Sequence, residues 1–271
     1  MVRRRIRLAQ NFFRDPGLVA SLVAGSSLGK NDVVYEIGPG EGIITRELAG
    51  RAGRVVAIEK DAALAARLRE RFRSARNVRV CAGDFLRHGI REPEYRVFSN
   101  IPFNITAEVV KGILFGANPP REAHLVLQKE AAGKFSGCPN ETEVSVLAKP
   151  GFAISVLRAF QRTDFEPAPG VDVVLLHIVR RQQPLVSPDD ARSYQEFVRF
   201  GFQARKRNLK TTYQRVFTYE QWKRLSQNLR FPIRATPSQL TFEQWLGLFE
   251  YFQAHVIDSK RARVSRGREE G

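Results

Sequence analysis

Cysteine is scarce in this chain of 271 residues, and its two cysteines, Cys81 and Cys138, form no CxxC pair. Disulfide-stapled domains and structural zinc sites need several cysteines at short, defined spacings. The sequence therefore predicts neither a disulfide framework nor a metal site. Internal repeats are also absent.

Long apolar runs are missing as well. No stretch of the sequence approaches the ~20 apolar residues that a membrane-spanning helix needs. The basic N-terminus, residues 1–7, is not followed by the apolar segment of a secretory signal. We therefore expect a cytoplasmic protein without a membrane partner.

Acidic residues are few, since 28 Asp and Glu stand against 44 Lys and Arg and give a net charge of +16. A protein this basic usually binds a polyanion, with nucleic acid the first candidate and an anionic membrane surface the second. Residues 181–271 carry half of this net charge in about a third of the chain. We predict that their densest cluster contacts RNA phosphates, the alternative being a solvated helix face. The cluster consists of Arg205, Lys206, Arg207 and Lys210.

Strand-like and helix-like segments alternate through the first half of the chain. This alternation predicts an α/β fold with a Rossmann-like, doubly wound, mostly parallel sheet. The expected strands are 33–37, 55–59, 78–84, 97–101 and 123–128. Two later runs, 152–160 and 171–179, have no helix between them, so we expect an antiparallel hairpin at the edge of the sheet.

The first strand runs into a glycine-rich turn at 38–42. In open α/β sheets, ligands bind at the carboxyl ends of the strands. The next two strands lead to Glu59, which can accept both ribose hydroxyls of a nucleoside, and to Asp84, which can accept the amine of an adenine ring. The glycine spacing is not GxGxxG, and a carboxylate at Glu41 disfavours a pyrophosphate. We therefore expect S-adenosylmethionine, which carries a sulfonium and an ammonium, rather than a nicotinamide dinucleotide.

A second motif, Asn100–Phe103, follows the fourth strand. Pro102 fixes its own φ and favours an extended Ile101, so the Asn100 amide and the Ile101 carbonyl can point out of the strand end. Two such acceptors would bind the N–H groups of an adenine N6 amine and draw its lone pair toward an incoming methyl group, while Phe103 stacks on the base. Taken alone, the motif is more typical of a plain strand-to-helix turn, and the rest of the chain is what favours the catalytic interpretation.

Together these motifs resemble the rRNA adenine N6-methyltransferases, the family of the Erm resistance enzymes and the KsgA-type dimethylases. The resemblance extends over about residues 8–180, and more loosely over the rest. The motifs that carry it are Gln10–Phe12, Glu36–Gly42, Glu59, Gly83–Phe85, Asn100–Asn104 and Phe165–Asp172.

The resemblance implies a site for S-adenosylmethionine. Asn11 and Phe13 would help to close over the cofactor, Glu59 would bind its ribose and Asp84 its adenine. Gly38 and Gly40 would lie against its methionine end, and Asn100 would lie between the cofactor and the target base. The full predicted set is Asn11, Phe13, Gly38, Gly40, Glu59, Asp84 and Asn100.

The resemblance also implies a catalytic motif made of Asn100, Ile101, Pro102 and Phe103. Phe103 would stack on an adenine that is flipped out of its helix, and Phe165 would pack on the other side of that base. The aromatic residue of this motif is often Tyr in the family. Phe103 retains the stacking face and loses any contact made by a hydroxyl.

Three regions are predicted from these patterns. Residues 1–183 would form the S-adenosylmethionine-dependent catalytic domain with a basic N-terminal arm. Residues 184–258, which follow a polar linker bounded by prolines, would form a small helical RNA-binding domain, and residues 259–271 a basic, disordered tail.

Two features favour the Erm branch of the family, namely Ile101 in the catalytic motif and the segment 241–249. This branch implies methylation of one adenine in naked or pre-ribosomal 23S rRNA and resistance to macrolides, lincosamides and streptogramin B. We expect the enzyme to act as a monomer. The alternatives are KsgA-type dimethylation of two adjacent adenines in 16S rRNA, or an RNA-binding assembly factor without catalytic activity.

Overall fold

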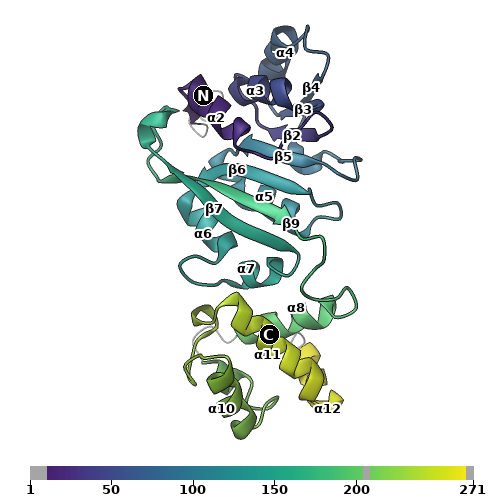
Figure 1. Cartoon of the computed structure of the whole chain (residues 1–271), viewed down its shortest axis with the longest axis vertical. Coiled ribbons are helices and arrows are strands. Elements are labelled where there is room, and N and C mark those ends of the chain that lie inside the picture. The colour runs from purple at the N-terminus through teal and green to yellow at the C-terminus, as the bar shows by residue number, and fades with distance from the viewer. Residues whose placement is uncertain (1–10, 204–207, 267–271) are drawn as a thin grey trace. The chain divides into compact units, whose positions relative to one another are not determined.

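The computed structural model describes residues 11–203 and 208–266 (Figure 1). The chain divides into two compact units: residues 1–132 with 154–180, and residues 133–153 with 181–271. The sequence suggested a single boundary at 183/184. Residues 133–153 instead group with the C-terminal unit, so the second unit is not one continuous segment.

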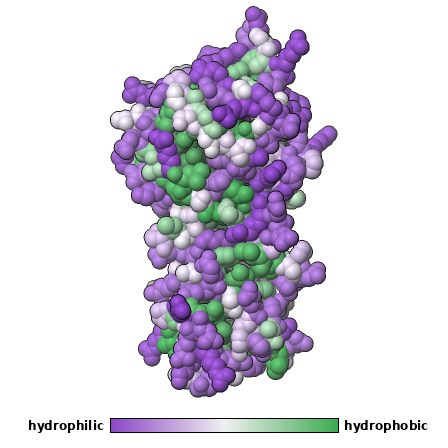
Figure 2. Space-filling view, in the orientation of Figure 1, coloured by the Kyte–Doolittle hydropathy of each residue, from purple (hydrophilic) through white to green (hydrophobic). Residues whose placement is uncertain are grey.

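The face of the protein seen in Figure 2 is mostly hydrophilic, with hydrophobic side chains gathered in small patches. Within 11–203 and 208–266, no helix combines the length and the apolar composition that crossing a membrane would require.

A seven-stranded sheet forms the centre of the first unit. Its strands are β2 (Val33–Ile37), β3 (Arg54–Glu59), β4 (Val78–Ala82), β5 (Arg96–Asn100), β6 (Glu122–Gln128), β7 (Phe152–Phe160) and β9 (Val173–Arg180). They lie in the order β4-β3-β2-β5-β6-β9-β7. Within the run β4-β3-β2-β5-β6 each strand is parallel to the next. On the other side of β6, β9 is antiparallel to it. The predicted mostly parallel sheet is confirmed, and β7 and β9 are neighbours at its edge.

Two helices of this unit, α2 and α4, begin at aspartate capping residues. Asp15 accepts a hydrogen bond from Gly17 N at the start of α2 (Pro16–Ala24), and Pro16 occupies the first helical position. Asp61 caps α4 (Ala62–Arg71) by accepting from two backbone N–H groups. The remaining helices are α3 (Ile43–Arg51), the one-turn η1 (Phe85–Arg87), η2 (Phe103–Ile105) and η3 (Arg162–Asp164), and α5 (Thr106–Phe115).

One face of the sheet packs against α2 and α3. Leu22 of α2 and Leu48 of α3 share a buried cluster with Val34, Val55 and Phe98 from three adjacent strands. Side chains alternate between the two faces along a strand. The residues two positions further along these strands therefore lie on the same face, at the carboxyl ends where a ligand would bind.

The N-terminal segment pairs with a part of the chain that is about 150 residues away in the sequence. β1 (Phe12–Phe13) pairs antiparallel with β8 (Phe165–Glu166), so that Phe13 lies opposite Phe165. The Phe13 ring lies 4.7 Å from the Phe165 ring and 5.4 Å from that of Phe160, measured between centroids. These contacts fix the position of Asn11, which directly precedes β1.

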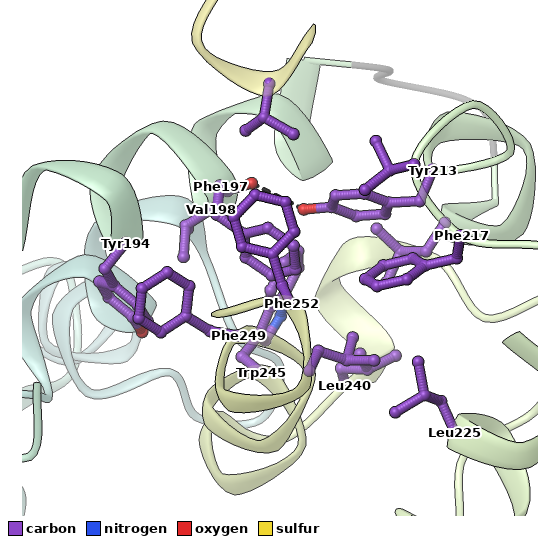
Figure 3. Packing of buried hydrophobic residues seen from close by; sticks show 14 of the residues in the cluster. Tyr194, Phe197, Val198, Tyr213, Phe217, Leu225, Leu240, Trp245, Phe249 and Phe252 are labelled. Carbon is purple, nitrogen blue, oxygen red and sulfur yellow. Dashed lines mark hydrogen bonds between the residues drawn. The ribbon is translucent and has the colours of Figure 1, made fainter. Parts of the chain in front are cut away.

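The second unit has a core rich in aromatic residues (Figure 3). Its described helices are α7 (Glu143–Ala148), α8 (Ala191–Gln203), α9 (Leu209–Thr212), α10 (Tyr219–Asn228), the one-turn η4 (Pro237–Gln239), α11 (Phe242–His255) and α12 (Asp258–Arg266). The chain division between the two units falls within α6 (Lys129–Ser136). The Phe197 ring lies 4.8 Å from the Tyr213 ring, and the Tyr213 hydroxyl donates to the Phe197 carbonyl at 2.6 Å. A Cβ at Gly201 would lie 2.4 Å from Trp245, so glycine is required for this close packing.

Specific contacts explain why residues 133–153 belong to the second unit. Val146 of α7 is fully buried in the same cluster as the aromatic residues, and its carbonyl accepts a 2.8 Å hydrogen bond from the Tyr194 hydroxyl. Arg181 also donates to the carbonyl of Lys149.

The prediction of a disordered tail from residue 259 was wrong up to residue 266. α12 is helical, and its Val264 is 5% exposed in the aromatic cluster. Arg261 fixes the start of the helix by donating from Nε to the Val256 carbonyl at 2.6 Å. Residues 267–271 lie outside the described part of the chain.

Candidate active site

The glycine-rich turn after β2 requires glycine for two reasons. Gly38, Gly40 and Gly42 all have positive φ angles, of 60°, 55° and 78°. Side chains other than hydrogen are disfavoured in this conformation. At Gly40 a Cβ would also lie 2.3 Å from the ring of Phe12. The N-terminal segment thus packs directly on the turn, and it does so through Phe12 rather than Phe13.

Glu59 ends β3 and is only 4% exposed. Its two carboxylate oxygens accept backbone N–H groups, one from Gly40 at 3.2 Å and the other from Asp61 at 2.9 Å. These bonds hold the carboxylate against the glycine-rich turn. A carboxylate has about four acceptor positions, so Glu59 can still accept hydroxyl groups of a ligand.

Asp84 lies two residues after β4 and caps η1 by accepting from Leu86 N at 3.1 Å. Its second oxygen accepts from the Lys60 ammonium at 2.8 Å. The hydrogen bond from Lys60 is the main reason that the pKa of Asp84 is lowered. Asp84 is therefore an ionised acceptor near neutral pH.

Asn100 ends β5, and its amide Nδ2 donates to the backbone carbonyl of Asn11 at 2.6 Å. This bond fixes the orientation of the Asn100 amide. Its oxygen is then the acceptor that can face a ligand. Ile101 is buried and donates its N–H to Val126 at 2.9 Å. Pro102 then leads into η2, where Phe103 is partly buried against the cluster that contains Phe13.

A pocket lies where these elements meet. Among the predicted residues its lining includes Asn11, Phe13, Gly38, Asn100, Ile101 and Pro102. The residues that sequence reasoning did not assign to the site are Phe12, Glu36, Pro39, Ile43 and Ile44. Gly40, Glu59, Asp84 and Phe103 lie outside this lining, although Gly40 belongs to the turn that forms one wall of the pocket and Glu59 accepts its N–H group.

Phe165 does not line the pocket either. Its side chain is 1% exposed, and its ring lies against Phe13 and Phe160 at centroid distances of 4.7 and 5.6 Å. In this arrangement it supports the aromatic cluster beneath the N-terminal segment and has no open face for a base. Its stacking on the target adenine stays a prediction.

Glu36 is the least expected residue of the site. It is the next-to-last residue of the otherwise apolar strand β2, is 1% exposed, and accepts a 2.6 Å hydrogen bond from the Thr45 hydroxyl of α3. Burial is the main reason that the pKa of Glu36 is raised to about 8, with the nearby Glu59 adding to the effect. The signal in the sequence was an acidic residue within an otherwise apolar strand.

The predicted RNA-contacting cluster falls largely outside the described residues, since only Lys210 is included. Lys210 lies in α9, with its ammonium 4.7 Å from the centre of the Tyr219 ring. Tyr219 is 55% exposed. A cation over an exposed aromatic ring is a surface that suits a phosphate next to a base.

Within the described residues, one group of side chains has the composition of a metal site: Glu122, His124 and His177. However, the Arg96 guanidinium forms a close ion pair with Glu122 and opposes a second cation there. The two imidazole rings are stacked 4.4 Å apart, and the His177 Nε2 lies 2.7 Å from Glu122. The group is better described as a buried polar network that joins β5, β6 and β9.

The fold and the site define a class of protein. A mostly parallel sheet, a glycine-rich turn after β2, acids at the ends of the next two strands and an Asn-Ile-Pro-Phe motif after β5 characterise a methyltransferase that takes its methyl group from S-adenosylmethionine. The chain belongs to the ribosomal RNA adenine dimethylase family, whose sequence profile matches residues 1–254.

Individual relatives agree with this assignment. An rRNA adenine N-6-methyltransferase of Aeromicrobium erythreum is 33% identical over 98% of this chain and 77% of its own length. A ribosomal RNA small subunit methyltransferase A of Moorella thermoacetica is also 33% identical, over 77% of this chain and 78% of its own. The crystal structure of the 23S rRNA methyltransferase ErmE superposes with a TM-score of 0.84 at 29% identity and covers 90% of this chain and all of that one. The protein is therefore an rRNA adenine N6-methyltransferase that uses S-adenosylmethionine.

Proposed function

We propose that this enzyme methylates N6 of one adenine in 23S rRNA and thereby confers resistance to macrolides, lincosamides and streptogramin B. The observation that carries the proposal is the extent of its similarities. The likeness to ErmE includes the whole ErmE chain, and the Aeromicrobium relative matches 98% of this chain. The small-subunit enzyme is equally identical but matches only 77% of it.

The residues of the site fit S-adenosylmethionine. Gly40 has no room for a side chain because the Phe12 ring packs on it, and this contact brings the N-terminal segment against the turn that carries Gly38. Glu59 and Asp84 are acceptors fixed by backbone N–H groups at adjacent strand ends. In our proposal they hold the ribose and the adenine of the cofactor, while Gly38 and Asn11 lie against its methionine end.

The bound cofactor would supply an electrophilic methyl group, and the residues after β5 would prepare the amine that attacks it. The Asn100 amide oxygen and the Ile101 carbonyl would accept the two N–H bonds of N6 and make its lone pair available. Phe103 would hold the flipped base by stacking. The bond from Asn100 to the Asn11 carbonyl supports this role, because it orients the amide before any substrate arrives.

The proposal further takes naked or pre-ribosomal 23S rRNA as the substrate, a monomeric enzyme and a cytoplasmic location. Arg205, Lys206, Arg207 and Lys210 would contact RNA phosphates. The net charge of +16 supports binding to a polyanion.

The second candidate is dimethylation of two adjacent adenines in 16S rRNA, favoured by the small-subunit relative. Expression of the protein in a macrolide-sensitive bacterium that lacks its own small-subunit dimethylase separates the two. We expect protection from macrolides and lincosamides without restored 16S methylation. A host that stays sensitive and regains 16S methylation would replace the proposal with the second candidate.

A further inference from the structure

The candidate pocket is lined by one ionisable side chain among the described residues, and that side chain is Glu36. The other polar side chains of its lining, Asn11 and Asn100, are neutral. Glu36 is 1% exposed and lines the pocket, so its carboxyl is almost completely removed from bulk water. A buried carboxyl in such a place strongly affects the charge of any ligand that can bind.

A second buried acid lies on the same side of the sheet. Glu36 pairs with Ala57 in the parallel register of β2 and β3, and Glu59 is two residues further along β3. Because side chains alternate, both carboxyls project from one face. Among the described residues, the charged group that affects the pKa of Glu36 is Glu59, whose charge has the same sign as that of the Glu36 carboxylate.

Two buried acids that have no basic partner among residues 11–203 and 208–266 favour one of two outcomes. Either one carboxyl keeps a proton, or a cation enters and compensates both charges. Burial and Glu59 raise the pKa of Glu36 to about 8, and the hydrogen bond from Thr45 partly offsets this shift. Without a ligand, Glu36 is therefore largely protonated at neutral pH.

We propose that Glu36 distinguishes the methyl donor, whose sulfur is positively charged, from the product, whose sulfur is neutral. Glu36 releases its proton when the donor binds and takes up a proton again after methyl transfer has produced the thioether. This inference rests on the proposed cofactor site. The first step is an exchange of charge: the carboxylic acid of Glu36 gives H⁺ to solvent, and the carboxylate that remains faces the cationic donor.

Methyl transfer then reverses the exchange. The C–N6 bond would form as the C–S bond of the donor breaks, which would leave a neutral thioether, and N6 would pass one of its two protons to solvent. The carboxylate of Glu36 would then face a ligand with one positive charge fewer, and a proton from solvent would neutralise the carboxylate. The pocket thus favours the donor before the reaction and loses that preference afterwards, which would help the product to leave.

Calorimetric titration with S-adenosylmethionine and S-adenosylhomocysteine, between about pH 6 and pH 8.5, tests this proposal. The two ligands share the same α-amino group, so its titration cancels in the ratio of their dissociation constants. Two unit charges several ångströms apart in a protein interact strongly enough to shift a pKa by one unit or more. We therefore expect the preference for the donor to increase about 10-fold over this pH range.

The number of protons released is measured independently by repeating the titrations in two buffers of different ionisation enthalpy. The donor should release more protons than the product near neutral pH. Glu36→Gln should remove this difference and the pH dependence of the ratio, whereas Glu70→Gln, at a side chain that is 74% exposed, should leave both unchanged. Thr45→Val, which removes the hydroxyl that favours the carboxylate, should move the pH dependence to higher pH.

Equal proton release for the two ligands, with a ratio that does not depend on pH, would overturn the role of Glu36 and leave the proposed function intact. This comparison uses the wild-type protein alone, so it decides the matter even if a variant does not fold. A wild-type protein that binds neither ligand would overturn the proposed cofactor site and this inference with it.

Discussion

Replacement of Gly40 by alanine is the most informative single change in the glycine-rich turn. The new methyl group would lie 2.3 Å from the Phe12 ring, and φ at this position is 55°. The ring must therefore move away or the turn must rearrange. Either movement disturbs the N–H group of Gly40 that holds Glu59 and the segment that carries Asn11.

The magnitude follows from two effects. A left-handed conformation costs a residue other than glycine about 1–2 kcal/mol. Displacement of Phe12 adds to this cost, so we expect the free energy of unfolding to fall by about 1–3 kcal/mol. Because the displaced groups form the cofactor pocket, affinity for S-adenosylmethionine should fall by about 10-fold or more.

Gly83→Ala is the matched control, since a Cβ at Gly83 has no neighbour within 4 Å and the residue directly precedes Asp84. Urea unfolding and calorimetric cofactor binding should show a large effect for Gly40→Ala and a small one for Gly83→Ala. Equal behaviour of the two variants, or a Gly40→Ala protein with wild-type affinity, would refute the packing of Phe12 on the turn as an element of the site.

Three further outcomes are expected. Phe103→Ala should reduce methyl transfer severely, because stacking on a base contributes about 1–3 kcal/mol, and Phe103→Tyr should be mild because it keeps the ring; similar rates for the two variants would exclude stacking. His124 is buried among Phe98, His177 and Arg96, and burial is the main reason that its pKa is lowered from 6.5 to about 3. At His124 the unfolded chain therefore binds more protons below pH 6.5, and the contribution of His124 to stability should fall as pH decreases toward 3, by up to about 1.4 kcal/mol per pH unit; urea unfolding of the wild-type and His124→Gln proteins at pH 7.5 and 5.5 checks this, because the opposite titration of Glu36 cancels in their difference, and an equal difference at both pH values would contradict it. Lys210→Ala should lower the salt slope of RNA binding by at most about one unit, and an unchanged slope would place the RNA path elsewhere.

The parts of the fold that local chemistry determines could be predicted from the sequence. Asp15 and Asp61 begin helices because their side chains accept the free N–H groups of the first turn. The positions of Glu59 and Asn100 at the ends of β3 and β5 could also be predicted. In a parallel sheet the last residues of the strands lie at the edge where ligands bind.

Features that depend on contacts between distant segments could not be predicted. Residues 133–153 join the second unit through contacts such as the hydrogen bond from the Tyr194 hydroxyl to the Val146 carbonyl. No local sequence pattern predicts such a bond. α12 is a helix whose described contact with the aromatic core is Val264, and this residue lies in a basic stretch without clear apolar periodicity. Likewise, the sequence did not reveal that Phe12, rather than its neighbour, would contact Gly40.

Mapping of the modified base tests the central claim most directly. Wild-type protein and the Asn100→Ala variant are incubated with labelled S-adenosylmethionine and with deproteinised 23S or 16S rRNA, and the labelled nucleotide is then located. We predict N6-methylation of one adenine in 23S rRNA by the wild-type protein, and no transfer by Asn100→Ala even though it still binds the RNA. Label at two adjacent adenines of 16S rRNA, or substantial turnover by Asn100→Ala, would contradict the account.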